Sequence, residues 1–206
     1  HRAKHVAMRG ASIDMKIGMA YHIMLSSVKL CYNKFNADHA VFCLEGRSWR
    51  KDFYEPYKKN RQVARMAKSV REQEEDQIMF QSYDDMITFL GEKTNVTMLR
   101  NPEAEADDMI ALFIAAHPND NHIIVSSDSD YFQLITDNVT MYDGVQNRII
   151  TKDGFFKDDK NMTPLKEKKT GEIKEKVDPE WALFEKCVRG DTSDNIFSAY
   201  PGCRKK

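Results

Sequence analysis

The chain has 206 residues, a net charge of −1 and 41% hydrophobic residues, values typical of one domain with its own core. Its longest apolar runs span only a few residues, and no basic segment precedes a long apolar one, so we expect neither a transmembrane helix nor a secretory signal. The small net charge conceals a separation of sign. Residues 43–71 carry nine basic and three acidic side chains, whereas residues 101–137 carry eight acidic ones and no Lys or Arg. A basic segment suits a polyanion, and an acidic segment suits hard metal ions.

The spacing of apolar residues predicts helices alternating with short strands along the chain. In chain order we expect a helix over 13–35, a strand over 39–44, a helix over 77–90, a strand over 96–99, a helix over 103–116, a strand over 122–126, a short helix over 131–135, paired strands over 139–142 and 148–151, and a helix over 178–188. This alternation predicts an α/β fold with a mostly parallel central sheet flanked by helices.

Gly91 is expected to end the helix over residues 77–90. Two segments interrupt the alternation of helices and strands. Residues 49–77 are basic and poor in aliphatic side chains, so we expect helices that are weakly anchored to a core. Residues 157–176 are lysine-rich and polar, and we expect them to form a mobile excursion. We expect one domain over residues 1–206 that includes both segments.

Three acidic clusters lie where the predicted strands and helices meet. Each has an ordinary structural explanation: acids in the first turn of a helix favour its dipole, acids after a strand are common in turns, and the last cluster resembles a plain loop. Residues two apart at the end of a strand point the same way, which favours a shared site for the second cluster. The clusters are Glu105, Asp107 and Asp108; Asp128 and Asp130; and Asp191 and Asp194.

In a parallel sheet these clusters are expected to converge, because functional side chains gather at the carboxyl ends of the strands. Two carboxylates about 4 Å apart repel by roughly 4 kcal/mol at an effective dielectric constant near 20. Since no Lys or Arg lies in residues 101–137, protons or cations must neutralise the group. All-oxygen sites select Mg²⁺, Mn²⁺ or Ca²⁺, and two such ions about 4 Å apart form a clamp used in phosphodiester cleavage.

Four motifs follow one another along the chain, and their order and spacing resemble those of a known family. They are residues 41–45 with 49–61, residues 105–108, residues 127–130 and residues 190–195. They resemble the 5′-nuclease family, which includes bacteriophage flap endonucleases, 5′→3′ exonucleases and the 5′-nuclease domain of bacterial DNA polymerase I. The phage members look most similar. The similarity covers about residues 39–61 and 101–202.

The resemblance implies a two-metal phosphodiesterase with Mg²⁺ or Mn²⁺ that cuts near 5′ ends or junctions during DNA replication, for example to remove RNA primers or flaps. Carried over by position, one ion is bound by Glu45, Glu105 and Asp107, and the other by Asp128, Asp130 and Asp194. Asp108 and Asp191 are expected behind these ligands or linked to the ions through water.

The resemblance also implies a helical arch over about 49–77 that grips the 5′ strand and the scissile phosphate. Its nucleic-acid-binding residues are expected to be Arg50, Lys51, Tyr57, Lys58, Lys59 and Arg61. Lys58 and Arg61, with Asp128 and Asp130, are the expected catalytic residues. On a helix, Lys58 and Arg61 would share one face because they are three residues apart.

Three departures from the family pattern stand out. The family begins with a strand that ends in a metal-binding Asp, whereas here Asp14 precedes a helix and is a poor substitute. Glu45 stands where an Asp is usual, which lengthens the ligand by one methylene. Residues 200–203 resemble the start of the family's helix-hairpin-helix DNA clamp, which is cut off there.

Two rival interpretations remain open. A PIN-like Mg²⁺-dependent ribonuclease would share the α/β core without needing the basic arch, and a catalytically weak protein could simply hold branched DNA. For the main interpretation we expect a monomer that binds branched or 5′-ended DNA or an RNA–DNA hybrid, that works with single-stranded-DNA-binding or replication proteins, and that has no membrane partner. Four cysteines without a CxxC pair favour reduced thiols in the cytoplasm, or in the host cytoplasm for a phage protein.

Overall fold

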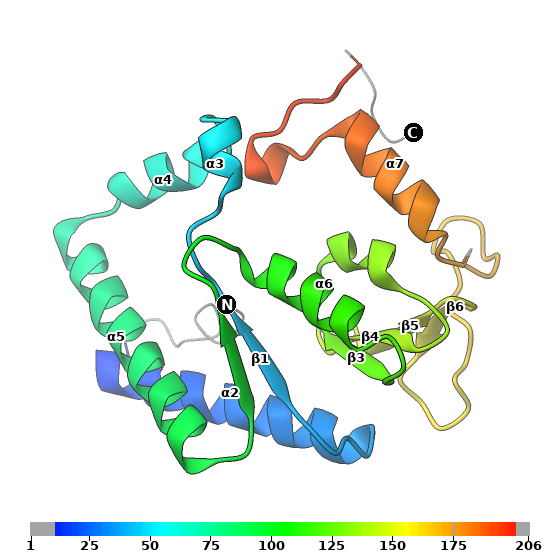
Figure 1. Ribbon diagram of the computed structural model, residues 1–206, viewed down its shortest axis with the longest axis horizontal. Helices are drawn as coiled ribbons and strands as arrows, with labels where there is room; N and C mark the ends of the chain where they lie inside the picture. Colours follow the sequence, from blue (N-terminus) through cyan, green and yellow to red (C-terminus); the bar gives the residue numbers. More distant parts are fainter. Residues whose placement is uncertain (1–10, 175, 201–206) are drawn as a thin grey trace. The chain divides into compact units, whose positions relative to one another are not determined.

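The computed structural model describes residues 11–174 and 176–200, which form two compact units (Figure 1). The first unit contains residues 11–48 and 59–105, and the second contains residues 49–58 and 106–200 apart from residue 175. Each unit combines helices with a pair of parallel strands, which confirms the predicted α/β class. The single domain expected over residues 1–206 stays a prediction. Most of the clamp start expected at residues 200–203 falls outside the described residues.

Two long helices dominate the first unit, α2 (Ile13–Lys34) and α5 (Val70–Lys93). The side chain of Ser12 caps α2 by accepting the Met15 N–H at 3.3 Å. The helices pack together at Ala20 and Met79, which are 0% and 4% exposed. Ala20 has no side chain beyond Cβ, so it permits a close approach of the two helix axes.

The strands of the first unit are β1 (Val41–Leu44) and β2 (Thr97–Arg100). They pair in parallel, with Val41 opposite Thr97 and Leu44 opposite Arg100. The chain crosses from β1 to β2 through helices, as a parallel pair requires. The residues that follow β1 and β2 therefore emerge at the same edge of the pair.

The helix expected over residues 77–90 is longer than the sequence pattern indicated. α5 begins after Ser69, whose hydroxyl accepts the Glu72 N–H while the Glu72 carboxylate accepts the Ser69 N–H. It then passes through Gly91 and ends at Lys93, so the expectation that Gly91 ends it is wrong. An interior glycine costs a helix only about 1 kcal/mol, and the burial of Leu90 one residue earlier offsets that cost.

The basic segment over residues 49–77 is helical, as expected, and the arch that the resemblance implies there stays a prediction. It contains the short helix α3 (Arg50–Phe53), the helix α4 (Lys59–Met66) and the first two turns of α5. α4 buries none of its residues, which agrees with the expected weak anchorage to a core.

The second unit is built on a four-stranded sheet in the order β3-β4-β5-β6 (Figure 1). β3 and β4 are parallel, while β4, β5 and β6 form an antiparallel meander. The sequence pattern missed β6, because its four residues begin with a glycine and end with a lysine. The strands are β3 (His122–Val125), β4 (Val139–Asp143), β5 (Arg148–Thr151) and β6 (Gly154–Lys157).

The turn that begins at Asp143-Gly144 joins β4 to β5, and their antiparallel pairing confirms the paired strands predicted over residues 139–142 and 148–151. The Asp143 carboxylate is fully buried and accepts the N–H groups of Val145 and Gln146 at 3.0 and 3.2 Å. Arg148 pairs with the same carboxylate at 3.0 Å. These bonds satisfy a buried charge that would otherwise be costly.

Helix α6 (Ala106–Ala116) covers the sheet of the second unit, with Ile110 and Ile114 packed on its core. The most buried core side chains are Ile135, Val139, Met141 and Ile150, which are 0–1% exposed. The other helices of this unit are η1 (Ser129–Leu134), α7 (Pro179–Arg189) and the short turn η2 (Thr192–Asp194). Among the described residues, no helix is long and apolar enough to cross a membrane.

The lysine-rich segment is anchored to the sheet over its described residues 157–174 rather than detached from it. The Lys157 N–H donates to the Thr163 carbonyl at 2.8 Å, and the Leu165 N–H donates to the Phe155 carbonyl at 2.8 Å. Leu165 also packs against the core. The sequence pattern predicted a mobile excursion because a few scattered apolar residues among many lysines give no periodic signal.

Candidate active site

The acidic clusters are divided between the two units. In the first unit, Glu45 directly follows β1, and Glu105 lies in the loop after β2, five residues beyond the end of that strand. Glu105 is only 3% exposed. The other six predicted ligands all belong to the second unit: Asp107, Asp108, Asp128, Asp130, Asp191 and Asp194.

Gly46 holds the loop after β1 against the loop after β2. Its N–H donates to the Ala104 carbonyl at 3.0 Å, and the Arg47 N–H donates to the Pro102 carbonyl at 2.8 Å. A Cβ at position 46 would lie 2.0 Å from the Asn101 carbonyl oxygen. Glycine is therefore required for the contact that positions the neighbouring Glu45.

Asp128 and Asp130 do not lie on an extended strand, so the expectation that they point the same way by strand alternation is wrong. β3 ends at Val125, and Asp128 is the N-cap of η1. One Asp128 carboxylate oxygen accepts the Asp130 N–H at 3.1 Å, and the Ser126 hydroxyl accepts the Asp128 N–H at 3.1 Å. The local preference of Asp for capping prevails over extension of the strand.

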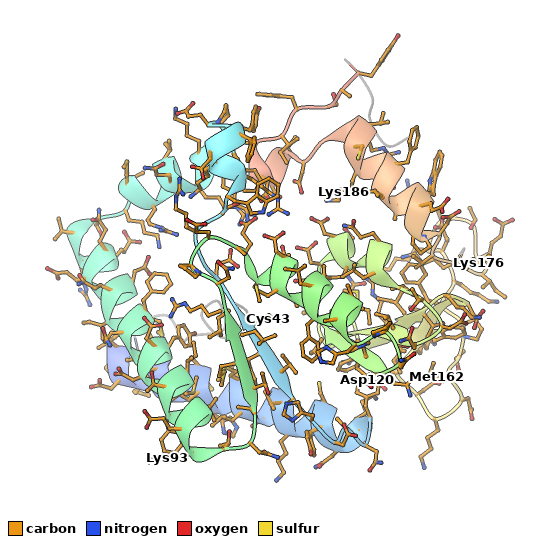
Figure 2. All side chains as sticks on the ribbon, viewed as in Figure 1. Cys43, Lys93, Asp120, Met162, Lys176 and Lys186 are labelled. Atoms are coloured by element: carbon orange, nitrogen blue, oxygen red, sulfur yellow. The ribbon has the colours of Figure 1, made fainter. Side chains whose placement is uncertain are left out.

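Lys186 of α7 links the second and third acidic clusters (labelled in Figure 2). Its Nζ lies 2.5 Å from Asp130 and 3.1 Å from Asp191. Burial alone would lower the pKa of Lys186, but its two carboxylate partners outweigh this effect and raise the pKa above the ordinary value. Lys186 was not among the predicted site residues. Its position five residues before Asp191, on the helix that leads into the acidic loop, is the signal that could have revealed it.

The carboxylate of Asp191 is strongly stabilised in its charged form. Burial acts to raise its pKa. Hydrogen bonds from Ser193 and Lys186 lower the pKa by more than burial raises it, so the net change is from 3.8 to about 2. The Ser193 hydroxyl and N–H both donate to one carboxylate oxygen, at 2.6 and 2.8 Å. Asp191 thus caps η2 and anchors Lys186 at the same time.

The helix-start cluster is also engaged with other side chains. Arg50 grips Asp108 with two parallel hydrogen bonds of 2.9 and 2.7 Å. The Tyr131 hydroxyl donates to Asp107. Arg50 was predicted to bind nucleic acid, and here its guanidinium is positioned by a carboxylate 58 residues away in sequence.

Asp194 joins the acidic loop to residues predicted for the arch. The Tyr57 hydroxyl donates to its carboxylate at 3.2 Å, and the Lys58 Nζ lies 3.7 Å from the same oxygen. The Lys58 N–H also donates to the Asp194 carbonyl at 2.9 Å. Lys58 has a φ of +55° and precedes α4, which carries Arg61, so the two do not share a helix face as predicted. Tyr57 is 6% exposed, so little of its ring is accessible for base stacking.

The remaining predicted nucleic-acid contacts are exposed cations. Lys51 lies on α3, and Lys59 and Arg61 lie on the first turn of α4. Exposed cations of this kind suit phosphate binding.

The donor chemistry of the predicted ligands, which are all carboxylates, suits Mg²⁺ or Mn²⁺. Across residues 11–174 and 176–200, no three Asp, Glu, His or Cys side chains are grouped so that they could hold a metal ion. In the second unit, lysine and arginine side chains pair with the carboxylates instead. The prediction was that protons or cations neutralise the acids, and basic side chains from distant segments are such cations. Arg50, Lys58 and Lys186 fill that role here.

Comparisons with known proteins point to one family. Residues 2–162 match a family described as 5′-3′ exonuclease, N-terminal resolvase-like domain. The flap endonuclease Xni of Pseudoalteromonas translucida (strain TAC 125) is 27% identical over 145 residues, which is 68% of this chain and 48% of that protein. The chain therefore spans about half the length of this relative.

Solved structures from bacteriophage T5 share the fold. The T5 D15 protein co-crystallised with metal ions matches with a TM-score of 0.66 at 19% identity, over 92% of this chain and 63% of that one. A T5 D15 flap endonuclease in a pseudo-enzyme–product complex with DNA and metal ions also matches with a TM-score of 0.66 at 19% identity, over 97% of this chain and 66% of that one. In both comparisons the chain spans less than two thirds of the T5 protein.

Proposed function

Because this chain belongs to the 5′-3′ exonuclease family, through its N-terminal resolvase-like domain, we propose that it is a structure-specific 5′ nuclease. It hydrolyses phosphodiester bonds near 5′ ends or junctions of DNA, as a flap endonuclease, a 5′→3′ exonuclease or both. The flap endonuclease relatives support this substrate class, and one T5 relative is described in a complex with DNA.

One observation about the second unit carries the proposal. Asp108, Asp130 and Asp194 come from segments far apart in sequence, yet each meets a basic side chain from another segment of the same unit. Such contacts fix the positions of both charges, so cations able to bind phosphate lie beside carboxylates able to bind hard metal ions.

The basic side chains supply the binding of the substrate in this proposal. Lys58, held beside Asp194, and Arg61, exposed on α4, contact phosphates of the 5′ strand near the scissile bond. Lys51 and Lys59 add less specific phosphate contacts. Cationic contacts of this type carry most of the affinity for nucleic acid and make it dependent on salt.

A divalent metal requirement belongs to the same proposal, with Mg²⁺ or Mn²⁺ and two ions. Oxygen-only side chains favour these hard cations, and the T5 relatives were crystallised with metal ions. Bound ions would activate water and stabilise the developing negative charge.

A cleavage assay with a labelled 5′-flap DNA tests the proposal. We expect cleavage of the flap in Mg²⁺, none in EDTA, and slower cleavage of a single-stranded RNA of equal length. Asp194→Asn should lose flap cleavage, whereas Asp153→Asn should keep it, because Asp153 is exposed in the β5–β6 turn, away from these contacts.

Each other outcome identifies a rival. Preference for single-stranded RNA over the flap would favour a PIN-like ribonuclease. Tight flap binding without cleavage in any divalent ion would favour a protein that only holds branched DNA. Either result would overturn the proposal.

The cellular setting we propose is a monomer in the cytoplasm that works beside replication proteins. The described cysteines, Cys31, Cys43 and Cys187, are free thiols, which supports a reducing compartment.

A further inference from the structure

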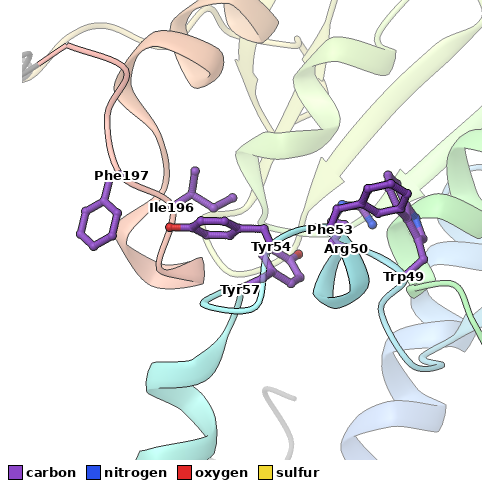
Figure 3. A pocket seen from close by; sticks show the side chains of 7 residues that line it. All are labelled: Trp49, Arg50, Phe53, Tyr54, Tyr57, Ile196 and Phe197. Carbon is purple, nitrogen blue, oxygen red and sulfur yellow. The ribbon is translucent and has the colours of Figure 1, made fainter.

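The second unit has an aromatic groove of about 410 Å³ between residues 49–57 and residues 196–197 (Figure 3). Its walls are Trp49, Phe53, Tyr54, Tyr57, Ile196 and Phe197, with Arg50 between the first two. Both segments belong to the same unit.

Three rings of this groove are unusually accessible for aromatic side chains. Phe53 is 85% exposed, Phe197 is 74% exposed and Trp49 is 44% exposed. An apolar ring that could be buried usually is, because burial stabilises it by about 1.5–3 kcal/mol. Clustered exposed rings are therefore typical of a binding surface.

Several contacts hold the groove in shape without a ligand. Arg50 lies 4.8 Å over the Trp49 ring while Asp108 grips its guanidinium, and the Phe53 ring meets Trp49 edge-to-face at 5.6 Å. The Asn195 side chain donates to the Pro56 carbonyl at 2.8 Å, which joins the two walls. A preformed groove loses little conformational entropy when it binds a ligand.

We propose that the aromatic groove binds unpaired nucleobases of single-stranded DNA by stacking. Bases present flat aromatic faces that stack on Trp and Phe with little sequence preference. Two cations stand beside the rings: Arg50 over Trp49 and Lys58 5.0 Å from the centre of Tyr57. Asp108 and Asp194 hold these two side chains in place, so their remaining N–H groups can donate to the phosphates that flank a stacked base. An apolar peptide would gain nothing from such donors.

This proposal rests on the proposed nuclease function for its choice of DNA, and it adds a contact to bases where the predicted arch residues contact phosphates. It explains why Trp49, Phe53 and Phe197 are exposed, a feature that phosphate binding does not require.

Trp49 itself provides the assay. The chain has two tryptophans, so Trp181→Phe leaves Trp49 as the single fluorescent reporter. In EDTA, a short oligothymidylate should quench Trp49 emission, and an abasic oligomer of the same length and charge should not. Phe53→Ala and Phe197→Ala, made in this background, should each weaken binding roughly 5- to 150-fold. The salt dependence should stay unchanged, because no phosphate contact is lost.

Phe184→Ala is the matched control, since Phe184 is an exposed aromatic residue on α7 outside the groove. It should bind the oligothymidylate like the parent. Phe53 and Phe197 are mostly exposed, so their variants should keep the parent's circular dichroism and melting temperature.

Equal quenching by the abasic oligomer would overturn the proposal, because the groove would then sense only phosphates. Absence of quenching would overturn it as well. If Phe53→Ala in that case also abolished self-association in sedimentation, a second copy of the chain would be the occupant. Quenching that persists in a protein unable to cleave flaps would refute the proposed nuclease function and leave the groove assignment intact.

Discussion

Replacing Lys186 by methionine removes one positive charge and keeps most of the aliphatic stem. In the parent protein, the Lys186 Nζ lies 2.5 Å from Asp130 and 3.1 Å from Asp191. The variant leaves both carboxylates without this partner, so we expect the second unit to lose stability in the absence of divalent ions.

The size of the loss follows from Asp191. Despite burial, hydrogen bonds from Ser193 and Lys186 lower its pKa from 3.8 to about 2, and at 1.36 kcal/mol per pKa unit the full shift corresponds to about 2.4 kcal/mol. Ser193 supplies part of this, and solvent screens partly exposed pairs. After that discount, Lys186→Met should lower the free energy of unfolding by about 1 kcal/mol, or the melting temperature by about 4–8 °C for a unit of this size.

The pH dependence separates this electrostatic effect from lost packing. A carboxyl group with a lowered pKa in the folded state stabilises the protein above its unfolded pKa, and this contribution disappears as the pH falls through the folded pKa. The difference between Lys186→Met and the parent should therefore be full above about pH 4 and vanish near pH 2. Denaturant unfolding in EDTA, followed by the fluorescence of Trp49 and Trp181, which both lie in the second unit, measures it.

Lys168→Met is the control, because Lys168 is an exposed lysine in the turn of the lysine-rich excursion. It should change stability by less than about 0.5 kcal/mol at any pH. A Lys186→Met protein as stable as the parent at pH 7, or equally destabilised at pH 7 and pH 2, would refute the reasoning.

Asp194→Asn should reduce flap cleavage by orders of magnitude in saturating Mg²⁺ and weaken flap binding by less than about tenfold, as measured by single-turnover rates and titration; near-parent rates would contradict this. Lys58→Ala should reduce the slope of the log binding constant for DNA against log salt concentration by about 0.7–0.9. Turnover should fall more than affinity. An unchanged slope and unchanged turnover would leave Lys58 a purely structural partner of Asp194. Gly46→Ala should lower the free energy of unfolding of the first unit by roughly 3 kcal/mol or more, because its Cβ would lie 2.0 Å from the Asn101 carbonyl oxygen. Gly18→Ala, in open space on α2, should raise this free energy by about 0.5–1 kcal/mol. Thermal unfolding measures both changes, and equal effects would show that the loop after β1 can shift.

Several elements could be predicted from the sequence because their signals are local. The apolar runs of β1 and β3, the turn at Asp143-Gly144 and the start of α7 each depend on residues a few positions apart. At α7, the Asp178 side chain caps the helix by accepting the Trp181 N–H at 3.0 Å, and Pro179 fills the first position. The acidic motifs likewise identified the family, because order and spacing along the chain are properties of the sequence alone.

The boundaries that failed depend on packing between elements. Gly91 ends a helix in isolation, yet α5 continues past it. The strand β6 and the anchored lysine-rich excursion are stabilised by β5 and by the core around Phe155, neither of which a short window of sequence reveals.

In the candidate site, the residues present were determined by the sequence and their partners by the tertiary structure. The sequence determined which carboxylates are present and that residues 101–137, which hold five of them, contain no Lys or Arg. Only the tertiary structure brought Arg50 to Asp108, Lys58 to Asp194 and Lys186 to Asp130, across separations of 56 to 136 residues in sequence. Coulomb energy depends on distance in space, and the fold, through the burial of apolar side chains that carry no charge, sets those distances.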